Sequence, residues 1–186
     1  MNQVVSQSHR AVALQAVAPR PTQFLTFMLG QEQYAVGILH IKEIIEYGSL
    51  ATVPMMPDCV RGVINLRGAV VPVLDLSARF GRAVSSIGKR SCIVIVEVGE
   101  GDGEVDAQRQ PKQVLGMLVD AVNAVVEIAA GDIEPPPSFG TRIRPDFIAG
   151  IGKYNGKFVI LLDIEHVLSN EEIVEMARGT VASYNS

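Results

Sequence analysis

The sequence contains only two cysteines, Cys59 and Cys92, and they do not form a C-x-x-C motif. Two cysteines are too few for the disulfide framework of a small secreted domain, so we expect a reducing, cytoplasmic compartment. The three histidines, His9, His40 and His166, are not spaced as metal ligands, and the chain has neither a G-x-S-x-G motif nor a glycine-rich phosphate-binding loop. The sequence therefore predicts no metal ion and no other cofactor.

The chain also lacks any run of basic residues. It has 20 acidic and 16 basic residues, a formal net charge of −4, no tryptophan, six phenylalanines and four tyrosines. Nucleic acids and anionic membrane surfaces attract clustered Lys and Arg, and single-stranded nucleic acids also stack on aromatic side chains. The composition therefore argues against both classes of partner and favours proteins.

Long hydrophobic runs are absent as well. No uninterrupted apolar stretch approaches the roughly 18–20 residues of a transmembrane helix, so we expect no direct insertion into a membrane. Residues 9–19, HRAVALQAVAP, resemble a secretory signal only in part, because the preceding MNQVVSQS carries no positive charge. We expect residues 1–21 to form a mobile tail of small and polar residues.

From Thr22 onward the apolar residues mostly recur with a period of two, which is typical of β-strands. Four short stretches show this pattern: QFLTFML (23–29), SCIVIVEV (91–98), QVLGMLVD (113–120) and GKFVILLDI (156–164). They are rich in β-branched residues and are bounded by turn-forming residues. The pattern predicts a mostly β fold, either a barrel or a sandwich.

Two other segments depart from this pattern. Residues 99–112, GEGDGEVDAQRQPK, combine glycines with mixed charges and predict a long, mobile hairpin loop that contributes little to binding. Residues 169–180 carry the signals of a helix, because Ser169 and Glu172 have the spacing of a capping box and Gly179 offers a stop. We expect a short C-terminal helix there.

The chain also repeats itself. Residues 57–76, PDCVRGVINLRGAVVPVLDL, align without a gap with residues 145–164, PDFIAGIGKYNGKFVILLDI, at an offset of 88 and with seven identical positions. Upstream, residues 34–46 overlay residues 115–127 at an offset of 81. Such a period is too long for a solenoid repeat, and it suits one small barrel of about five strands made twice.

The two repeats differ at one hairpin tip. The letters INLR in the first repeat correspond to GKYN in the second, and Glu43 corresponds to Ala124. Pro72 corresponds to Ile160, and because proline lacks an N–H donor we expect an edge strand or a bulge at Pro72. A distinct tip beside an edge predicts a docking surface on the first repeat.

The buried strand of each repeat ends in an aspartate, Asp75 or Asp163. The simpler interpretation is that each carboxylate accepts hydrogen bonds from the backbone N–H groups that follow it. A remote alternative of another class is an aspartic-type hydrolase, in which two related barrels each supply one carboxylate. The contexts LDL and LDI lack the D-[ST]-G loop of those proteases, so the sequence favours a protein without enzymatic activity.

Four segments taken in order resemble the CheW family of chemotaxis coupling proteins. They are FLTFMLGQEQYAVGILHIKEI, PDCVRGVINLRGAVVPVLDL, VDAVNAVVEI and FIAGIGKYNGKFVILLDIEHVL, and the N-L-R-G-x-x-V-P-V-x-D-L stretch is highly specific to CheW-type domains. The resemblance implies two SH3-like five-stranded β-barrels in tandem within residues 22–168. We expect the first unit at about 33–95 and the second at about 96–168, with strand 22–30 joining either.

The resemblance further implies an adaptor that binds the cytoplasmic tip of a methyl-accepting chemotaxis receptor and the regulatory domain of a CheA-type histidine kinase. An adaptor of a pilus-driven (twitching) or second-messenger pathway stays open as an alternative. Carried over by position, the receptor site uses Ile38, Ile41, Glu43, Gly62, Ser91, Cys92 and Val125. The kinase site uses Asn65, Leu66, Arg67 and Gly68.

The two isoleucines and Arg67 each have a second interpretation. Ile38 and Ile41 correspond to apolar residues of the other repeat, so packing in the core is as consistent with the sequence as exposure. Arg67 is either a solvated turn residue or the holder of a carboxylate, Glu43 or one from a partner, because its planar guanidinium favours bidentate pairing.

Overall fold

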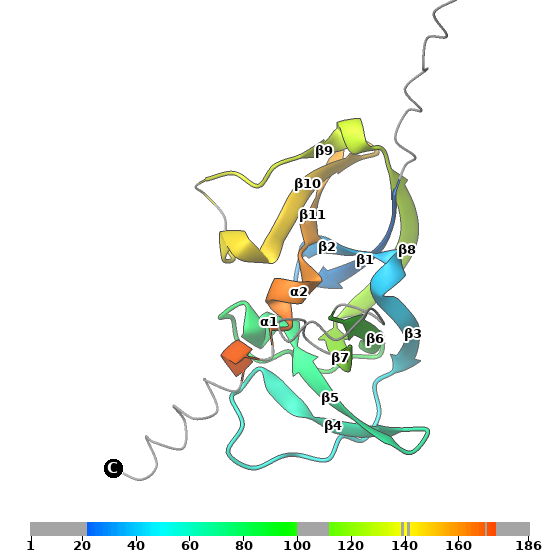
Figure 1. The fold of residues 1–186 in the computed structure, drawn as a ribbon, viewed down its shortest axis with the longest axis vertical. Coiled ribbons are helices and arrows are strands. Elements are labelled where there is room, and N and C mark those ends of the chain that lie inside the picture. The colour runs from blue at the N-terminus through cyan, green and yellow to red at the C-terminus, as the bar shows by residue number, and fades with distance from the viewer. Residues whose placement is uncertain (1–21, 100–111, 139, 141, 170, 174–186) are drawn as a thin grey trace, which may run out of the picture.

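The computed structural model describes residues 22–99, 112–138, 140, 142–169 and 171–173. The predicted tail, residues 1–21, and most of the predicted loop at 99–112 lie outside these residues. Strands dominate the described part of the chain and form two sheets, one above the other in Figure 1. The predicted mostly β fold is therefore confirmed.

The first barrel is a five-stranded sheet in the order β3-β6-β7-β5-β4. Its strands are β3 (Ile41–Glu46), β4 (Val60–Leu66), β5 (Ala69–Asp75), β6 (Cys92–Val98) and β7 (Gln113–Val119). The second barrel is a six-stranded sheet in the order β8-β1-β2-β11-β10-β9. Its strands are β1 (Thr22–Leu29), β2 (Glu32–Gly37), β8 (Ala121–Ile128), β9 (Ile133–Glu134), β10 (Ile148–Tyr154) and β11 (Lys157–Leu162).

Short helices connect these strands. They are the α-helices α1 (Leu76–Arg79) and α2 (Ile164–Val167) and the 3-10 helices η1 (Ile38–His40), η2 (Ala130–Asp132) and η3 (Pro145–Phe147). The helix η1 links β2 of the second barrel to β3 of the first. A residue on η1 therefore lies at a crossover between the two barrels.

The two barrels have equivalent topologies, as the sequence repeat predicted. The hairpins β4–β5 and β10–β11 obey the offset of 88, and each is followed by a four-residue helix whose N-cap is Asp75 or Asp163. In each barrel the second strand of this hairpin also pairs in parallel with a strand distant in sequence, β5 with β7 and β11 with β2. The chain therefore contains the same barrel topology twice.

The sheets do not follow the predicted contiguous ranges of about 33–95 and 96–168. The strand β2 pairs with β1 and β11 in the second barrel, and β7 pairs with β6 and β5 in the first. The strands of the first barrel therefore run from residue 41 to residue 119, and those of the second come from both sides of this range. The reason is that a parallel pair needs a long crossover connection, so the partner strand comes from a distant part of the sequence.

Pro72 does not lie on an edge strand of the sheet, because β5 has β7 on one side and β4 on the other. The prediction that Pro72 lies on an edge strand was therefore wrong. The bulge in the β4–β5 ladder falls between Val60 and Gly62 and not at Pro72. However, β7 pairs only with Val73–Asp75. Pro72 therefore occupies the part of β5 that pairs with β4 alone, where the missing N–H removes no bond to β7.

The largest apolar cluster extends through both barrels, and each barrel also has a smaller buried cluster of its own. Leu25 and Phe27 of the second barrel belong to the same buried cluster as Val94 and Met117 of the first. A row of aromatic rings crosses the boundary, because Phe80 of the segment after α1 lies 5.6 Å from Tyr34 and 5.8 Å from Phe147, measured between ring centroids. Apolar burial is therefore the main force that holds the two barrels together.

Of the predicted C-terminal helix, residues 171–173 are helical and Ser169, just before them, is not, while residues 170 and 174–180 lie outside the described residues. Glu172 accepts hydrogen bonds from Arg79 at 2.6 Å and from Arg144 at 2.8 and 2.9 Å. The hydrogen bonds from Arg144 and then Arg79 lower the pKa of Glu172 from its ordinary value of 4.5 to about 2. This carboxylate ties the C-terminal turn to both barrels.

We expect this ionic cluster to weaken in acid. Because folding depresses the pKa of Glu172, its carboxylate stabilises the folded protein fully above about pH 4.5, and this contribution is lost as the pH falls toward about 2. The measurement is the melting temperature of wild type and Glu172→Gln between pH 2 and 6. The difference between the two proteins should shrink steadily toward pH 2, whereas Glu127→Gln, whose carboxylate faces the neutral Gln23 amide, should differ little throughout. A pH-independent difference for Glu172→Gln would contradict the assignment.

Candidate protein-binding site

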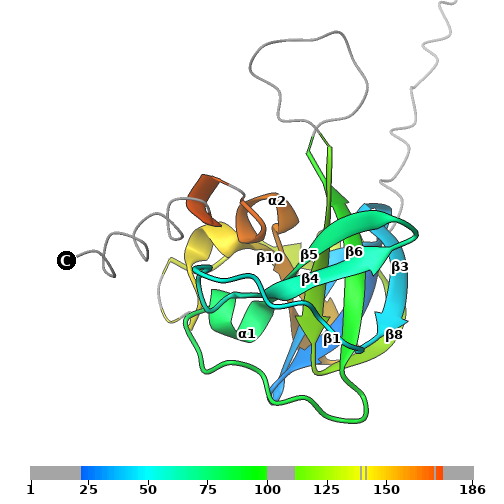
Figure 2. The same cartoon turned by 90° about the horizontal axis from the view of Figure 1, so that it is seen from below.

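The turn between β4 and β5 presents Arg67 toward the opposite edge of the first barrel. Arg67 and Gly68 both have positive φ, 52° and 88°, and the Asn65 Oδ1 atom accepts a hydrogen bond of 2.8 Å from the Gly68 N–H. This conformation directs the hairpin toward β3 (Figure 2). The sheet order places β3 and β4 at opposite edges, so the hairpin spans the seam where the sheet closes.

Arg67 and Glu43 form a bidentate ion pair across this seam. The guanidinium donates two hydrogen bonds to the Glu43 carboxylate, Nη1 to Oε1 at 2.7 Å and Nη2 to Oε2 at 2.8 Å. These bonds lower the pKa of Glu43 below its ordinary value. The Arg67 side chain is 75% exposed and that of Glu43 27%, so both charges are open to a partner.

The equivalent position of the second barrel has no such pair. Asn155 takes the place of Arg67 and has the same left-handed backbone, with φ of 48°. Ala124 takes the place of Glu43 and carries no charge. The turn geometry therefore belongs to the shared fold, and the ion pair is particular to the first barrel.

An exposed apolar surface adjoins this pair on η1 and β3. Leu39 is 94% exposed and Ile44 is 43% exposed, whereas Ile38 is only partly exposed and Ile41 packs partly against the core. Val125 on β8 adds an apolar side chain that is 51% exposed on the second barrel. Ile41 and Ile44 pair with Val96 and Val94, whereas Glu43 pairs with Ile95, so Glu43 points to the opposite face of β3 from the two isoleucines. Because β3 is an edge strand, residues of both faces are grouped under one name: Leu39, Ile41, Glu43, Ile44 and Val125, along η1, β3 and β8, are called the crossover surface below.

Sequence reasoning missed Leu39, although a signal was present. At the offset of 81, Leu39 corresponds to Asp120, so an apolar residue stands where the other repeat has an acid. It missed Val70 on β5 too, which is 72% exposed beside the kinase-site prediction. In that case no signal was available, because AVVPV is apolar on both faces of the strand and gives no alternation.

Three of the predicted receptor-site residues do not join the exposed surface. Ser91 is buried, and its Oγ atom accepts a hydrogen bond of 2.8 Å from the Gly88 N–H. Cys92 is partly buried, donates its S–H to the Arg90 carbonyl at 3.2 Å, and pairs with Glu46 rather than with Glu43. Ser91 and Cys92 therefore shape the start of β6, and the prediction that they line a groove with Glu43 has no support in their positions.

Gly62, the third of these, is buried for a reason of packing. Its φ is 152°, and a Cβ atom at this position would lie 2.5 Å from the Ala51 carbonyl oxygen. Ala51 and Val63 exchange two backbone hydrogen bonds of 2.9 Å here, which bring the segment after β3 against β4. Gly62 therefore permits closure of the barrel and contacts no partner directly.

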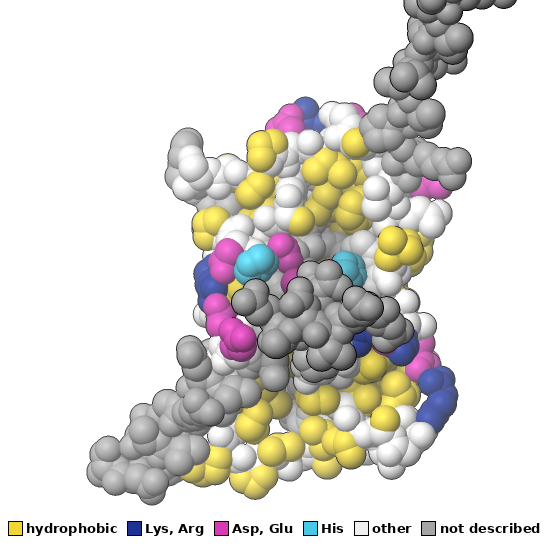
Figure 3. Space-filling view, in the orientation of Figure 1, with side chains coloured by type: hydrophobic (Ala, Val, Ile, Leu, Met, Phe, Trp, Pro, Cys, Tyr) yellow, Lys and Arg dark blue, Asp and Glu magenta, His cyan; other side chains and the backbone are white. Residues whose placement is uncertain are grey.

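The predicted kinase-site residues lie together at the hairpin tip. Asn65, Arg67 and Gly68 are exposed, and Leu66 packs partly against the inner cluster of the first barrel. On the face seen in Figure 3, apolar side chains gather over the lower part of the molecule, where β4 and β5 lie in Figure 1, and basic and acidic side chains lie along the right edge of this part. The tip is thus a mixed apolar and polar surface.

Asp75 and Asp163 do not form a catalytic dyad. The buried Asp75 carboxylate accepts hydrogen bonds from the backbone of Ser77, Ala78 and Ser85 and from the Ser85 hydroxyl, and it contacts Arg61 at 3.4 Å. Asp163 accepts from the His166 backbone N–H and contacts its Nδ1 atom at 2.9 Å. Each carboxylate serves its own helix terminus, so the hydrolase alternative is not supported and the simpler interpretation holds.

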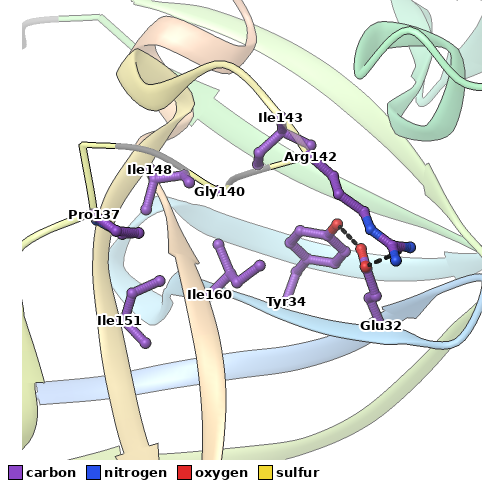
Figure 4. A pocket seen from close by; sticks show the side chains of 9 residues that line it. All are labelled: Glu32, Tyr34, Pro137, Gly140, Arg142, Ile143, Ile148, Ile151 and Ile160. Carbon is purple, nitrogen blue, oxygen red and sulfur yellow. Dashed lines mark hydrogen bonds and ion pairs between the residues drawn. The ribbon is translucent and has the colours of Figure 1, made fainter.

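A cleft of about 290 Å³ opens on the second barrel (Figure 4). Its lining is mostly apolar but includes Glu32 and Arg142. The Tyr34 hydroxyl donates a hydrogen bond of 2.6 Å to Glu32, which also contacts Arg142 at 3.5 Å. Burial and the hydrogen bond to Glu32 raise the pKa of Tyr34 to about 12, so the phenol stays protonated at neutral pH. The residues that line the cleft therefore provide no activated nucleophile.

The described residues include neither a candidate metal site nor a candidate membrane-spanning helix. No group of three or more His, Cys, Asp and Glu side chains there is arranged to hold a metal ion. In the same part of the chain, no helix combines the length and the apolar character needed to cross a membrane.

Comparisons with known proteins agree with this description. Residues 23–172 match the family model of the CheW-like domain. The chain is 32% identical over 151 residues to the chemotaxis protein CheW of Klebsiella aerogenes, covering 81% of this chain and 84% of that protein. It is 32% identical over 149 residues to the chemotaxis protein CheW of Helicobacter pylori, covering 80% and 82%. The crystal structure of the scaffolding protein TtCheW from Thermoanaerobacter tengcongensis aligns with a TM-score of 0.69 and 34% identity, covering 81% of this chain and 90% of that one.

Proposed function

The chain belongs to the CheW-like domain family, and from this membership we propose that it is a non-enzymatic adaptor of chemosensory signalling. It couples the cytoplasmic tip of a methyl-accepting chemotaxis receptor to the regulatory domain of a CheA-type histidine kinase. The observation that carries the proposal is the Arg67–Glu43 ion pair, because it is exposed, bidentate and absent from the equivalent position of the second barrel. The place of action is the cytoplasm, at receptor arrays.

The receptor docks on the crossover surface. This surface combines exposed apolar side chains with one carboxylate, which suits a partner that offers apolar contacts around a basic or hydrogen-bonding group. Leu39 supplies the largest exposed apolar area, and Glu43 fixes the register of the partner.

The kinase regulatory domain docks on the hairpin tip of the first barrel, residues 65–68, with Val70 beside it. Arg67 belongs to both surfaces, because its guanidinium reaches from the tip to Glu43 on the crossover surface. The Arg67–Glu43 ion pair therefore lies between the two partners, and the adaptor contacts each of them through it.

The experiment that tests this proposal is a pull-down with purified components. The tagged chain is mixed with a soluble receptor signalling tip, with a kinase regulatory domain, or with both together. We expect binary binding to each partner and a ternary complex when both are present, and an excess of kinase domain should not displace the receptor tip. Failure to bind either partner would overturn the proposal, and full competition between them would show that the two surfaces are one.

A further inference from the structure

Arg79 is a buried cation at the boundary of the two barrels. It lies in α1, directly after β5 of the first barrel, and only 8% of its surface is exposed. Among the described residues it is the only Lys or Arg that is buried. A guanidinium is removed from water at a large free-energy cost unless hydrogen bonds and an opposite charge compensate for it.

All of the compensating groups belong to the second barrel and the turn that follows it. The Arg79 Nε atom donates to the Val167 carbonyl at 2.7 Å and Nη2 donates to the His166 carbonyl at 3.5 Å, both in α2. Nη2 also donates to Glu172 at 2.6 Å. The guanidinium carbon lies 4.8 Å from the centroid of the Phe147 ring, within the range of a cation–π contact.

The hydrogen bonds of Arg79 are directional, unlike the apolar contacts of the shared core. Apolar packing is non-directional, so a core that extends through both barrels holds them together without selecting one angle between them by itself. Hydrogen bonds to two backbone carbonyls and a carboxylate form in one arrangement of the planar guanidinium. The bonds of Arg79 are therefore sensitive to the angle between the barrels.

We propose that Arg79 is a positioning residue that fixes the angle between the two barrels and thereby aligns the two halves of the crossover surface. Glu43 and Ile44 lie on the first barrel and Val125 lies on the second, so a partner that contacts all three requires one relative orientation. The hairpin tip, residues 65–68, lies on the first barrel alone and does not depend on that angle. The expected effect on receptor binding rests on the proposed function, whereas the expected effect on the angle between the barrels does not.

The test compares Arg79→Met, which keeps an apolar stem of similar length, with wild type in two measurements. Residual dipolar couplings report the orientation of each barrel in solution, and binding assays report affinity for a receptor signalling tip and for a kinase regulatory domain. We expect the two barrels of Arg79→Met to require different alignment tensors. Its affinity for the receptor tip should fall by about tenfold, while its affinity for the kinase domain stays within about twofold.

Two further variants keep the inference falsifiable. Arg79→Lys retains the charge without the planar fork and should lose part of the receptor affinity, so it replaces Arg79→Met if that variant does not fold. Arg82→Met is the matched control, because Arg82 also joins the barrels, through Glu32 and Tyr34, but is more exposed and contacts side chains only. Its orientation and binding should change less. If the residual dipolar couplings of Arg79→Met are the same as those of wild type, the inference is overturned. The same holds for Arg79→Lys if Arg79→Met does not fold. If wild type fails to bind the receptor tip, the proposed function fails, while the couplings still decide the role of Arg79.

Discussion

Replacing Asp75 by alanine is expected to destabilise the fold by about 3–5 kcal/mol, the cost typical of removing one partner from a buried charged network. The Asp75 side chain is fully buried and faces three backbone N–H groups, a hydroxyl and the Arg61 guanidinium. The bonds to Ser85 also hold the segment after α1 against the end of β5. Alanine leaves these donors without an acceptor in a place that excludes water.

The equivalent residue of the second barrel supplies the control. Asp163 caps α2 with a single backbone bond, and 34% of its side chain is exposed, so Asp163→Ala should cost only about 1 kcal/mol, as is usual for a helix N-cap. The measurement is urea unfolding of both variants and wild type, with the midpoints compared at an unchanged slope. Equal losses from the two variants would show that burial and the extra bonds of Asp75 add nothing to its capping role.

Alanine in place of Arg67 or Glu43 is expected to leave the fold intact and to abolish the ternary assembly. An exposed ion pair contributes about 0–1 kcal/mol to stability, so both variants should melt close to wild type. In the proposed complex the same pair lies between two partners, and truncating one member of a charge pair that is desolvated at an interface costs about 2–5 kcal/mol of binding free energy. The measurement is formation of the complex of receptor tip, adaptor and kinase domain, and the kinase activity within it.

An exposed ion pair of the second barrel provides a matched control. Lys153 of β10 and Glu134 of β9 lie 2.8 Å apart, and their side chains are 50% and 58% exposed. Neither residue belongs to the crossover surface or to the hairpin tip, so Lys153→Ala should assemble normally. The double variant Arg67→Ala/Glu43→Ala should lose no more than the worse single variant, because the two side chains act as one unit. Normal assembly by both single variants would mean that the Arg67–Glu43 pair has no role in binding.

The sequence by itself determined the kind of fold and its duplication. Period-two alternation and the positions of turn-forming residues are local properties, so the strands at 23–29, 91–98, 113–120 and 156–164 could be predicted within one or two residues. The repeat at an offset of 88 needed only comparison of the chain with itself. It predicted equivalent places for Asp75 and Asp163, and the difference between INLR and GKYN predicted which hairpin tip is distinctive.

Only the tertiary structure decided which strands share a barrel and which side chains reach the surface. The parallel pairs β5–β7 and β2–β11 join segments far apart in the chain, and no local pattern specifies the partner of a strand that is apolar on both faces. For the same reason the burial of Ser91, just before β6, and the exposure of Leu39, on the crossover η1, could not be predicted, because each depends on tertiary packing and not on a local pattern. Arg79 is the clearest case: its sequence context is that of an ordinary surface arginine, and its burial depends on carbonyl groups that the fold brings to it from residues 166 and 167.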